Sequence, residues 1–113
     1  MEVSKKDWML FRERIGVWQE SYMERLAQEY IQILSSEKAG SQKFWELEER
    51  LRADKKSPGV QLRLSKGNVP SDLARLVSAG VISWEALDGF SEELKDCLLD
   101  GEQFKALATY KKS

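Results

Sequence analysis

The chain has 113 residues, of which 18 are basic and 19 are acidic, so its net charge is only −1. This length indicates a single domain, and the balanced charge argues against a wholly basic nucleic-acid-binding protein and against a disordered acidic tail. The single cysteine, Cys97, excludes an internal disulfide and a multi-cysteine metal site.

The residue types that the commoner enzyme chemistries need are missing. The chain has no histidine, which removes the most frequent general base and the usual zinc ligand. It has no glycine-rich phosphate loop, calcium-binding loop or dinucleotide-binding pattern. The acidic pairs Glu48-Glu49 and Glu92-Glu93 are adjacent in sequence and therefore point to different sides of a helix. We expect a protein that is not an enzyme and that holds no cofactor or metal ion.

Nothing in the sequence resembles a targeting or membrane segment. Charged residues interrupt the apolar ones from the start of the chain, so we expect no secretory signal. No apolar run approaches the roughly 18 residues that a membrane-spanning helix needs. The sequence predicts a cytoplasmic protein with no membrane contact.

A long amphipathic helix is predicted from Lys5 to about Ser36. Its main apolar row has a mean step of 3.57 over 25 residues, close to the 3.6 residues of an α-helical turn. This row consists of Trp8, Phe11, Ile15, Trp18, Tyr22, Leu26, Tyr30 and Ile33. A second row, which widens the stripe, consists of Leu10, Val17, Met23, Ala27, Ile31 and Leu34. Charged residues fill the opposite side, as in a helix with one buried face, and Ser4 is the predicted N-cap.

The interior glycine and the length of this helix both have structural consequences. Gly16 costs about 1 kcal/mol relative to alanine, so either another backbone packs closely against that turn or the helix bends there. At about 1.5 Å per residue the helix is roughly 48 Å long, whereas a compact domain of this size has a radius of gyration of about 13 Å. The helix therefore bends or projects beyond its domain, and a projecting apolar stripe needs a partner.

A second helix is predicted from Ser41 to about Ala53, after a short connection that would fold it back antiparallel to the first. Its apolar face consists of Phe44, Leu47 and Leu51, with Trp45 beside it. Two acid-before-base pairs in the favourable order are Glu46 with Arg50 and Glu48 with Arg52. At about 20 Å this helix covers less than half of the first, so the C-terminal segment or another copy must cover the rest.

The segment after the second helix is predicted to be irregular. Ser57-Pro58-Gly59 has the composition of a turn in which Gly59 takes a positive φ. Apolar and polar residues alternate over 60–65, which is the period of a strand. Because no second strand is apparent, this piece is either extended coil packed on the helices or a strand that pairs with its own copy across a dimer axis.

The remainder reads as a cap of short helices. A third helix has Pro70 in its first turn and ends at Gly80, and a short helix follows between Ser83 and Leu87. Ser91 is the predicted N-cap of a last helix. The spacing of Phe104, Leu107 and Tyr110 indicates a further helical turn near the end of the sequence.

Positive charge is concentrated in one segment. Residues 50–66 carry six basic residues and one acidic residue, a net charge of +5. The basic residues are Arg50, Arg52, Lys55, Lys56, Arg63 and Lys66. One interpretation is a solvated loop whose charges attract acidic faces of the same or a neighbouring chain. The other is contact with the phosphates of nucleic acid.

Two stretches of the chain are informative together: DWMLFRERIGVWQESY from Asp7 and KFWELEERLRADKKSPGVQL from Lys43. They resemble a group of small uncharacterised bacterial proteins, some of which are carried on mobile elements. The resemblance covers most of the chain. It implies a bacterial accessory protein, and it transfers no activity and no functional residue.

The fold predicted from these patterns is all-α, with one domain over residues 1–113. A helical hairpin occupies 1–53, a basic connector 54–68 and a cap of short helices 69–113. The predicted function is a non-enzymatic interaction or structural module that forms a homodimer or binds an unidentified protein. The candidate self-association residues are Trp8, Phe11, Ile15, Trp18 and Tyr22. The alternative is weak nucleic-acid binding through the basic residues of 50–66.

Overall fold

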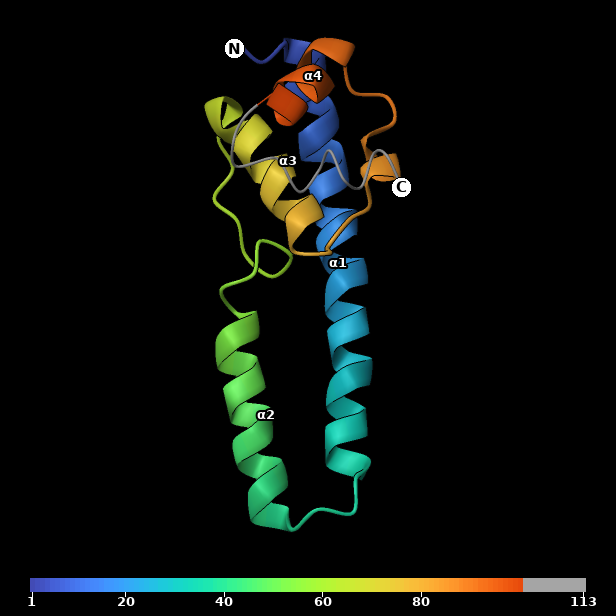
Figure 1. Ribbon diagram of the computed structural model, residues 1–113, viewed down its shortest axis with the longest axis vertical. Helices are drawn as coiled ribbons and strands as arrows, with labels where there is room; N and C mark the ends of the chain where they lie inside the picture. The colour runs from blue at the N-terminus through green and yellow to red at the C-terminus, as the bar shows by residue number, and fades with distance from the viewer. Residues whose placement is uncertain (101–113) are drawn as a thin grey trace.

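The computed structural model describes residues 1–100, and within this range the protein is all-α with no strand (Figure 1). The elements in chain order are α1 (Lys5–Ser35), α2 (Gly40–Asp54), the short 3₁₀ helix η1 (Lys66–Asn68), α3 (Val69–Ser78), the 3₁₀ helix η2 (Trp84–Leu87) and α4 (Glu92–Asp100). The predicted order of helices is confirmed. The predicted turn containing Phe104, Leu107 and Tyr110 lies outside the described residues.

The molecule has a head and an arm. The head contains the first half of α1 together with α3, η2 and α4, and the arm (residues 23–54) is the antiparallel hairpin of the second half of α1 and α2 (Figure 1). The molecule extends 52 × 27 × 19 Å, and its radius of gyration is 16.5 Å rather than the roughly 13 Å of a compact chain. The long helix therefore projects beyond its domain, as its length predicts.

Capping interactions define both ends of α1. The Ser4 hydroxyl accepts a hydrogen bond from the Asp7 N–H at 3.1 Å, so the predicted N-cap is confirmed. At the other end Ser36 donates to the Ile33 carbonyl from both its N–H and its hydroxyl. The helix continues through Gly16, where an added Cβ would meet nothing within 4 Å. The expectation of close backbone packing at Gly16 is wrong, because this glycine faces solvent.

The hydrophobic core lies in the head. Its centre is formed by fully buried side chains of α1, α3, η2 and α4, among them Phe11, Leu73, Leu87 and Leu98. The remaining members are Val3, Ile15, Val69, Ala74, Leu76, Val77, Val81, Ile82, Phe90 and Leu94. Because α1 contributes its main apolar row here, the first half of the long helix is covered by the C-terminal half of the chain.

A Schellman motif ends α3 and turns the chain back over the core. Gly80 has a φ of 74° and donates to the Val77 carbonyl, while the Val81 N–H donates to the Leu76 carbonyl at 2.9 Å. Arg25 on α1 then donates to the carbonyls of Gly80 and Val81, both at 3.0 Å. This contact fastens the end of α3 to the middle of the long helix.

The connector between α2 and α3 packs against α1 at Pro58 and Gly59. The side chain of Gln19 donates to the Pro58 carbonyl at 3.0 Å. Beside it, a Cβ at Gly59 would overlap the ring of Tyr22 and lie 2.7 Å from Cγ2 of Val81. The predicted turn at Ser57-Pro58-Gly59 is present, but Gly59 does not use the positive φ that glycine permits, which among residues 1–100 only Gly80 and Gly89 have. Gly59 is needed because two elements approach it too closely for a side chain.

The alternation over 60–65 does not form a strand. Residues 61–65 have no regular secondary structure within the single chain, as the extended-coil interpretation expects, and pairing with a second copy stays a prediction. Leu62 is partly buried against the core, whereas Leu64 is 42% exposed. The alternating pattern over 60–65 therefore marks one residue, Leu62, that contacts the core, whereas the residues next to it do not.

Candidate functional site

The five residues predicted to mediate self-association belong to the chain's own head. Phe11 and Ile15 are 0% and 5% exposed, and both are core residues. Trp8, Trp18 and Tyr22 are partly buried against the same core. Ring contacts connect them, with Trp8 stacked on Phe11 at 6.4 Å between centroids. The structure therefore corrects this prediction: α3, η2 and α4 cover the row that seemed free in the sequence.

Exposed apolar side chains are concentrated instead on the arm. The arm buries only Leu26 and Ile33, both from α1, and α2 has no buried residue at all. Among the exposed large apolar side chains of the arm are five that we call the arm face: Met23, Ile31, Leu34, Phe44 and Leu51. Their exposed fractions are 36%, 53%, 49%, 63% and 39%, respectively.

Helical geometry and a groove place four of these residues on the same side of the hairpin, whereas Ile31 lies about 80° around α1 from Met23. On α1, Leu34 follows Met23 by three turns and lies within about 20° of the same line. On α2, Phe44 precedes Leu51 by two turns and is similarly aligned. Met23 and Leu51 line opposite sides of one groove of about 200 Å³ between the helices. The other groove residues are Leu26, Tyr30, Asp54, Lys55 and Val60.

A polar cluster between the two helices of the hairpin joins α1 to α2. Arg50 contacts Glu29 at 2.7 Å and Asp54 at 3.6 Å, and its guanidinium lies 5.7 Å from the ring centre of Tyr30. The Tyr30 hydroxyl donates to the Asp54 carboxylate at 2.5 Å. These four residues, which we call the clasp, join the helices by directional contacts. Tyr30 and Asp54 also line the groove beside Met23 and Leu51, so the polar contacts lie between the helices.

The structure divides the predicted basic residues into separate groups. Arg50 belongs to the clasp, where its hydrogen bond to Glu29 raises the pKa of its guanidinium above the ordinary value for arginine. It does not form the predicted pair with Glu46, which contacts Lys38 at 2.6 Å instead. Lys66 lies in the head, beside Met1, Glu2 and Val3.

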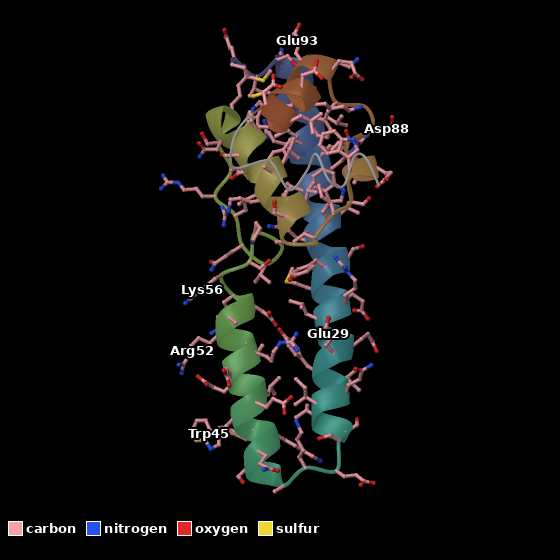
Figure 2. All side chains as sticks on the ribbon, viewed as in Figure 1. Glu29, Trp45, Arg52, Lys56, Asp88 and Glu93 are labelled. Atoms are coloured by element: carbon pink, nitrogen blue, oxygen red, sulfur yellow. The ribbon has the colours of Figure 1, made fainter. Side chains whose placement is uncertain are left out.

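The remaining basic residues lie on or beyond α2. Arg52 forms the predicted exposed pair with Glu48. Lys55, Lys56 and Arg63 are exposed and have no carboxylate partner among residues 1–100. Trp45, Arg52 and Lys56 project from the side of α2 that faces away from α1 (Figure 2). The sequence segment is therefore not one patch, and only part of it is available on the outside of α2.

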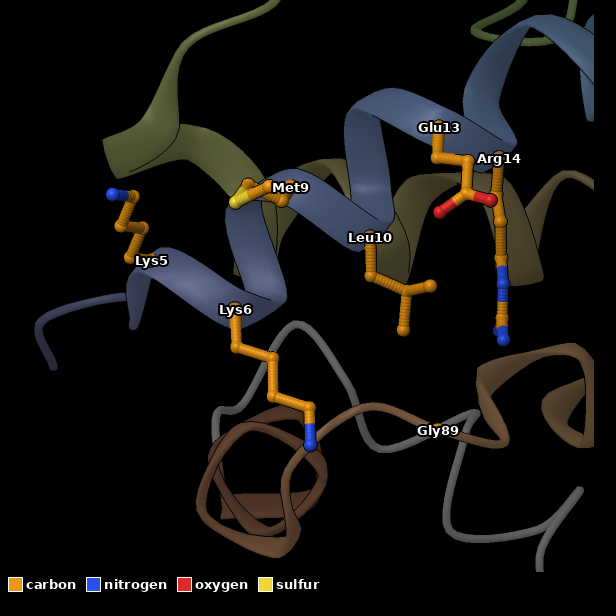
Figure 3. A pocket seen from close by; sticks show the side chains of 7 residues that line it. All are labelled: Lys5, Lys6, Met9, Leu10, Glu13, Arg14 and Gly89. Carbon is orange, nitrogen blue, oxygen red and sulfur yellow. The ribbon is translucent and has the colours of Figure 1, made fainter.

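A second groove, of about 700 Å³, lies in the head between α1 and the segment around Gly89. Figure 3 shows Leu10 and Arg14 on successive turns of α1, both pointing toward this segment. Arg14 donates to the carbonyls of Ala86 and Asp88, and a Cβ at Gly89 would lie 3.3 Å from Leu10. Because its arginine already binds backbone carbonyls of the chain, this groove is a packing seam of the head.

Within residues 1–100, no group of three or more acidic, cysteine or histidine side chains is placed to hold a metal ion. The same part of the chain has no helix that is long and apolar enough to cross a membrane. Cys97 is a free, half-buried thiol.

The sequence shows that the arm-face residues are apolar, but it predicts another role for them than self-association. The second apolar row of α1 contains Met23, Ile31 and Leu34. The predicted apolar face of the second helix contains Phe44 and Leu51. The available signal was the length mismatch, because α2 is too short and too polar to cover both rows of α1. Comparisons with protein-family models, curated proteins and solved structures find no match to this chain.

Proposed function

We propose that this protein is a non-enzymatic helical module that self-associates through the arm face. The observation that carries the proposal is the arm itself, a hairpin that leaves the five large apolar residues of the arm face exposed. Such a surface is costly to leave in water, at about 25 cal/mol per Å² of apolar surface. A second copy of the chain presents the same face and covers it.

The exposed area agrees with the requirements of a dimer. With on the order of 150–250 Å² per large side chain, the exposed fractions leave roughly 450 Å² of apolar surface on each arm face. One side of a standard interface buries about 800 Å², of which about 56–65% is apolar. The arm face supplies an amount of this order.

The proposed assembly is a two-fold dimer in which the arms pack face to face as a four-helix bundle. A two-fold interface uses the same patch on both copies, so one exposed face per chain is enough. Tyr30 and Asp54 of the clasp line the groove between Met23 and Leu51, so this part of the clasp lies at the floor of the proposed interface. The heads remain free at the ends of the arms to contact further partners.

Light scattering after size exclusion tests the proposal. We expect a mass of about twice the 13.0 kDa chain at both low and high salt, because apolar association does not weaken as salt rises. Leu34→Glu and Phe44→Glu place a charge in the arm face and should each give a monomer. The matched control is Val17→Glu, at a residue of α1 that is 67% exposed but outside the arm face. A monomeric wild-type protein, or equal loss in the control, would refute the proposal.

We infer a cytoplasmic location and, from the resemblance to small bacterial proteins, a role as a bacterial accessory protein. A fluorescent fusion expressed in a bacterium tests the location: diffuse cytoplasmic signal is expected, and signal confined to the envelope would contradict it.

A further inference from the structure

We infer that the outside of α2 and the connector bind single-stranded nucleic acid, a function separate from self-association. The surface, which we call the outer edge, consists of Trp45, Arg52, Lys55, Lys56 and Arg63. It combines an exposed aromatic ring with a run of exposed cations that no other part of the described chain repeats.

The cations of the outer edge are available to a ligand. The exposed pair of Arg52 with Glu48 has a side-chain exposure of 72% at Arg52, so water weakens it and a phosphate can displace the carboxylate. Lys55, Lys56 and Arg63 have no carboxylate partner among residues 1–100. Arg52 lies in the last turn of α2, and Lys56 follows directly after the C-cap residue Lys55. Arg52 and Lys56 therefore present two positive charges on the side that faces away from α1, and Lys55 lies next to them in sequence at the end of the groove between the helices.

The aromatic residue makes the edge suited to bases as well as phosphates. Trp45 is 64% exposed and lies on the same side of α2 as Arg52 and Lys56, about 10 Å from Arg52 along the helix (Figure 2). Its ring contacts Phe44 edge-on at 5.0 Å, which holds it while a face stays open to solvent. The turn between Trp45 and Arg52 carries Glu48 and Glu49, so the indole supplies stacking at one end of the edge and the cations supply charge at the other.

The same features distinguish a single strand from other polyanions. A duplex keeps its bases stacked on one another, so it offers Trp45 no base face. An acidic peptide or an anionic membrane satisfies the lysines but supplies no unstacked base. The tip of the arm near Trp45 is also balanced in charge, with Lys38 and Lys43 against Glu37 and Glu46, which does not favour a membrane surface.

The test is fluorescence anisotropy with a labelled 15-nucleotide dT strand, compared with a duplex of the same length and with heparin. We expect the wild-type protein to bind the single strand with an affinity that falls as salt rises, with a log–log slope of about −0.7 for each phosphate contacted. Trp45→Ala should weaken this binding by at least about fivefold and leave heparin binding unchanged.

The chain offers a matched control for charge. Lys55→Glu/Lys56→Glu should abolish binding, whereas Lys5→Glu/Lys6→Glu makes the same change of charge at an exposed pair in the head and should retain it. Equal loss in both double variants, or no effect of Trp45→Ala, would show a non-specific polyanion interaction and overturn the inference.

Leu34→Glu separates the two proposals. This variant should be monomeric and should still bind the single strand, because the outer edge belongs to one chain. Loss of binding together with loss of dimer would show that the surface requires two copies, which contradicts a site on a single outer edge.

Discussion

Single residues of this protein affect the free energy of unfolding by different physical mechanisms, and each can be tested separately. Asp72 in α3 is 5% exposed, and its Oδ2 has no hydrogen-bond partner among the described residues. Burial raises the pKa of this carboxyl above 3.8, and the charge of Arg75 lowers it in part. The folded state thus binds the Asp72 proton more tightly than the unfolded state does. The stabilisation from this group is complete below the unfolded pKa and is lost as pH rises through the folded pKa.

Asp72→Asn should therefore raise the free energy of unfolding at neutral pH, because it removes an unpaired buried charge. The gain should shrink as the pH is lowered toward 4, where the wild-type carboxyl becomes protonated. Urea unfolding of both proteins between pH 3.5 and 7.5 measures this difference. A gain that stays constant with pH would show that the charge of Asp72 is not the cause.

Two glycines should respond oppositely to alanine. Gly59→Ala places a Cβ against Tyr22 and Val81 and should destabilise the protein by about 1–3 kcal/mol, the usual cost of overpacking. Gly16→Ala meets nothing within 4 Å on an exposed helical turn and should stabilise it by about 0.5–1 kcal/mol. Thermal unfolding monitored by circular dichroism compares the two, and destabilisation by Gly16→Ala would contradict the open environment of that turn.

At the scale of elements, polar contacts hold the helices in their relative positions. Asp7 on α1 is 1% exposed, and its carboxylate accepts from the Ser91 N–H at 3.0 Å and the Ser91 hydroxyl at 2.6 Å. The same hydroxyl accepts from the Leu94 N–H and so caps α4. One serine therefore begins α4 and fixes it to the start of α1.

Ser91→Ala should cost about 2–4 kcal/mol of stability, since it removes an N-cap and leaves the buried Asp7 carboxylate without its hydroxyl partner. A double-mutant cycle with Asp7→Ala measures the coupling, which should lie in the range of about 0.5–3 kcal/mol found for contacting residues. Additive effects would mean that the contact between Asp7 and Ser91 contributes no net stability.

The clasp performs the same task in the arm and should respond to alkaline pH. Burial, the hydrogen bond to Asp54 and the charge of Asp54 raise the pKa of Tyr30 to about 12, although Arg50 lowers it in part. A raised pKa stabilises the folded state below pH 10, and this contribution is lost as pH rises through about 12. Absorbance at 295 nm should show one tyrosine that ionises last, and Tyr30→Phe should remove that step alone.

At the scale of the whole molecule, stability should be unevenly distributed. The head contains the core, whereas α2 has no buried residue and depends on the clasp and on partial contacts with α1. Segments with little buried apolar surface open with lower free energy than the core does. The arm is thus the part of the molecule whose order depends most on a partner.

Hydrogen exchange should show this difference directly. In a monomeric Leu34→Glu variant the amides of α2 should exchange faster than those of α3, and in the self-associated wild-type protein the arm should gain protection while α3 changes little. Mass spectrometry of peptides from each helix makes the comparison. Equal protection of α2 in both proteins would argue that the arm is stable by itself.

The sequence by itself determined the helices, their order and the projection of the arm. Those properties follow from local signals: apolar steps of 3 and 4, Ser4 and Ser91 at helix starts, Gly80 at a helix end, and a helix longer than a domain of this size can enclose. Each of them acts over a few residues or follows from chain length, so it can be read without knowledge of distant contacts.

Only the tertiary structure decided which surface stays exposed. α3 and α4 pack on the row of α1 that contains Phe11 and Ile15, which leaves Ile31 and Leu34 of the second row exposed. The role of Gly59 likewise depends on Tyr22 and Val81, which are distant in sequence. Periodicity reveals that a face is apolar, but the partner that covers it depends on contacts between residues far apart in the chain.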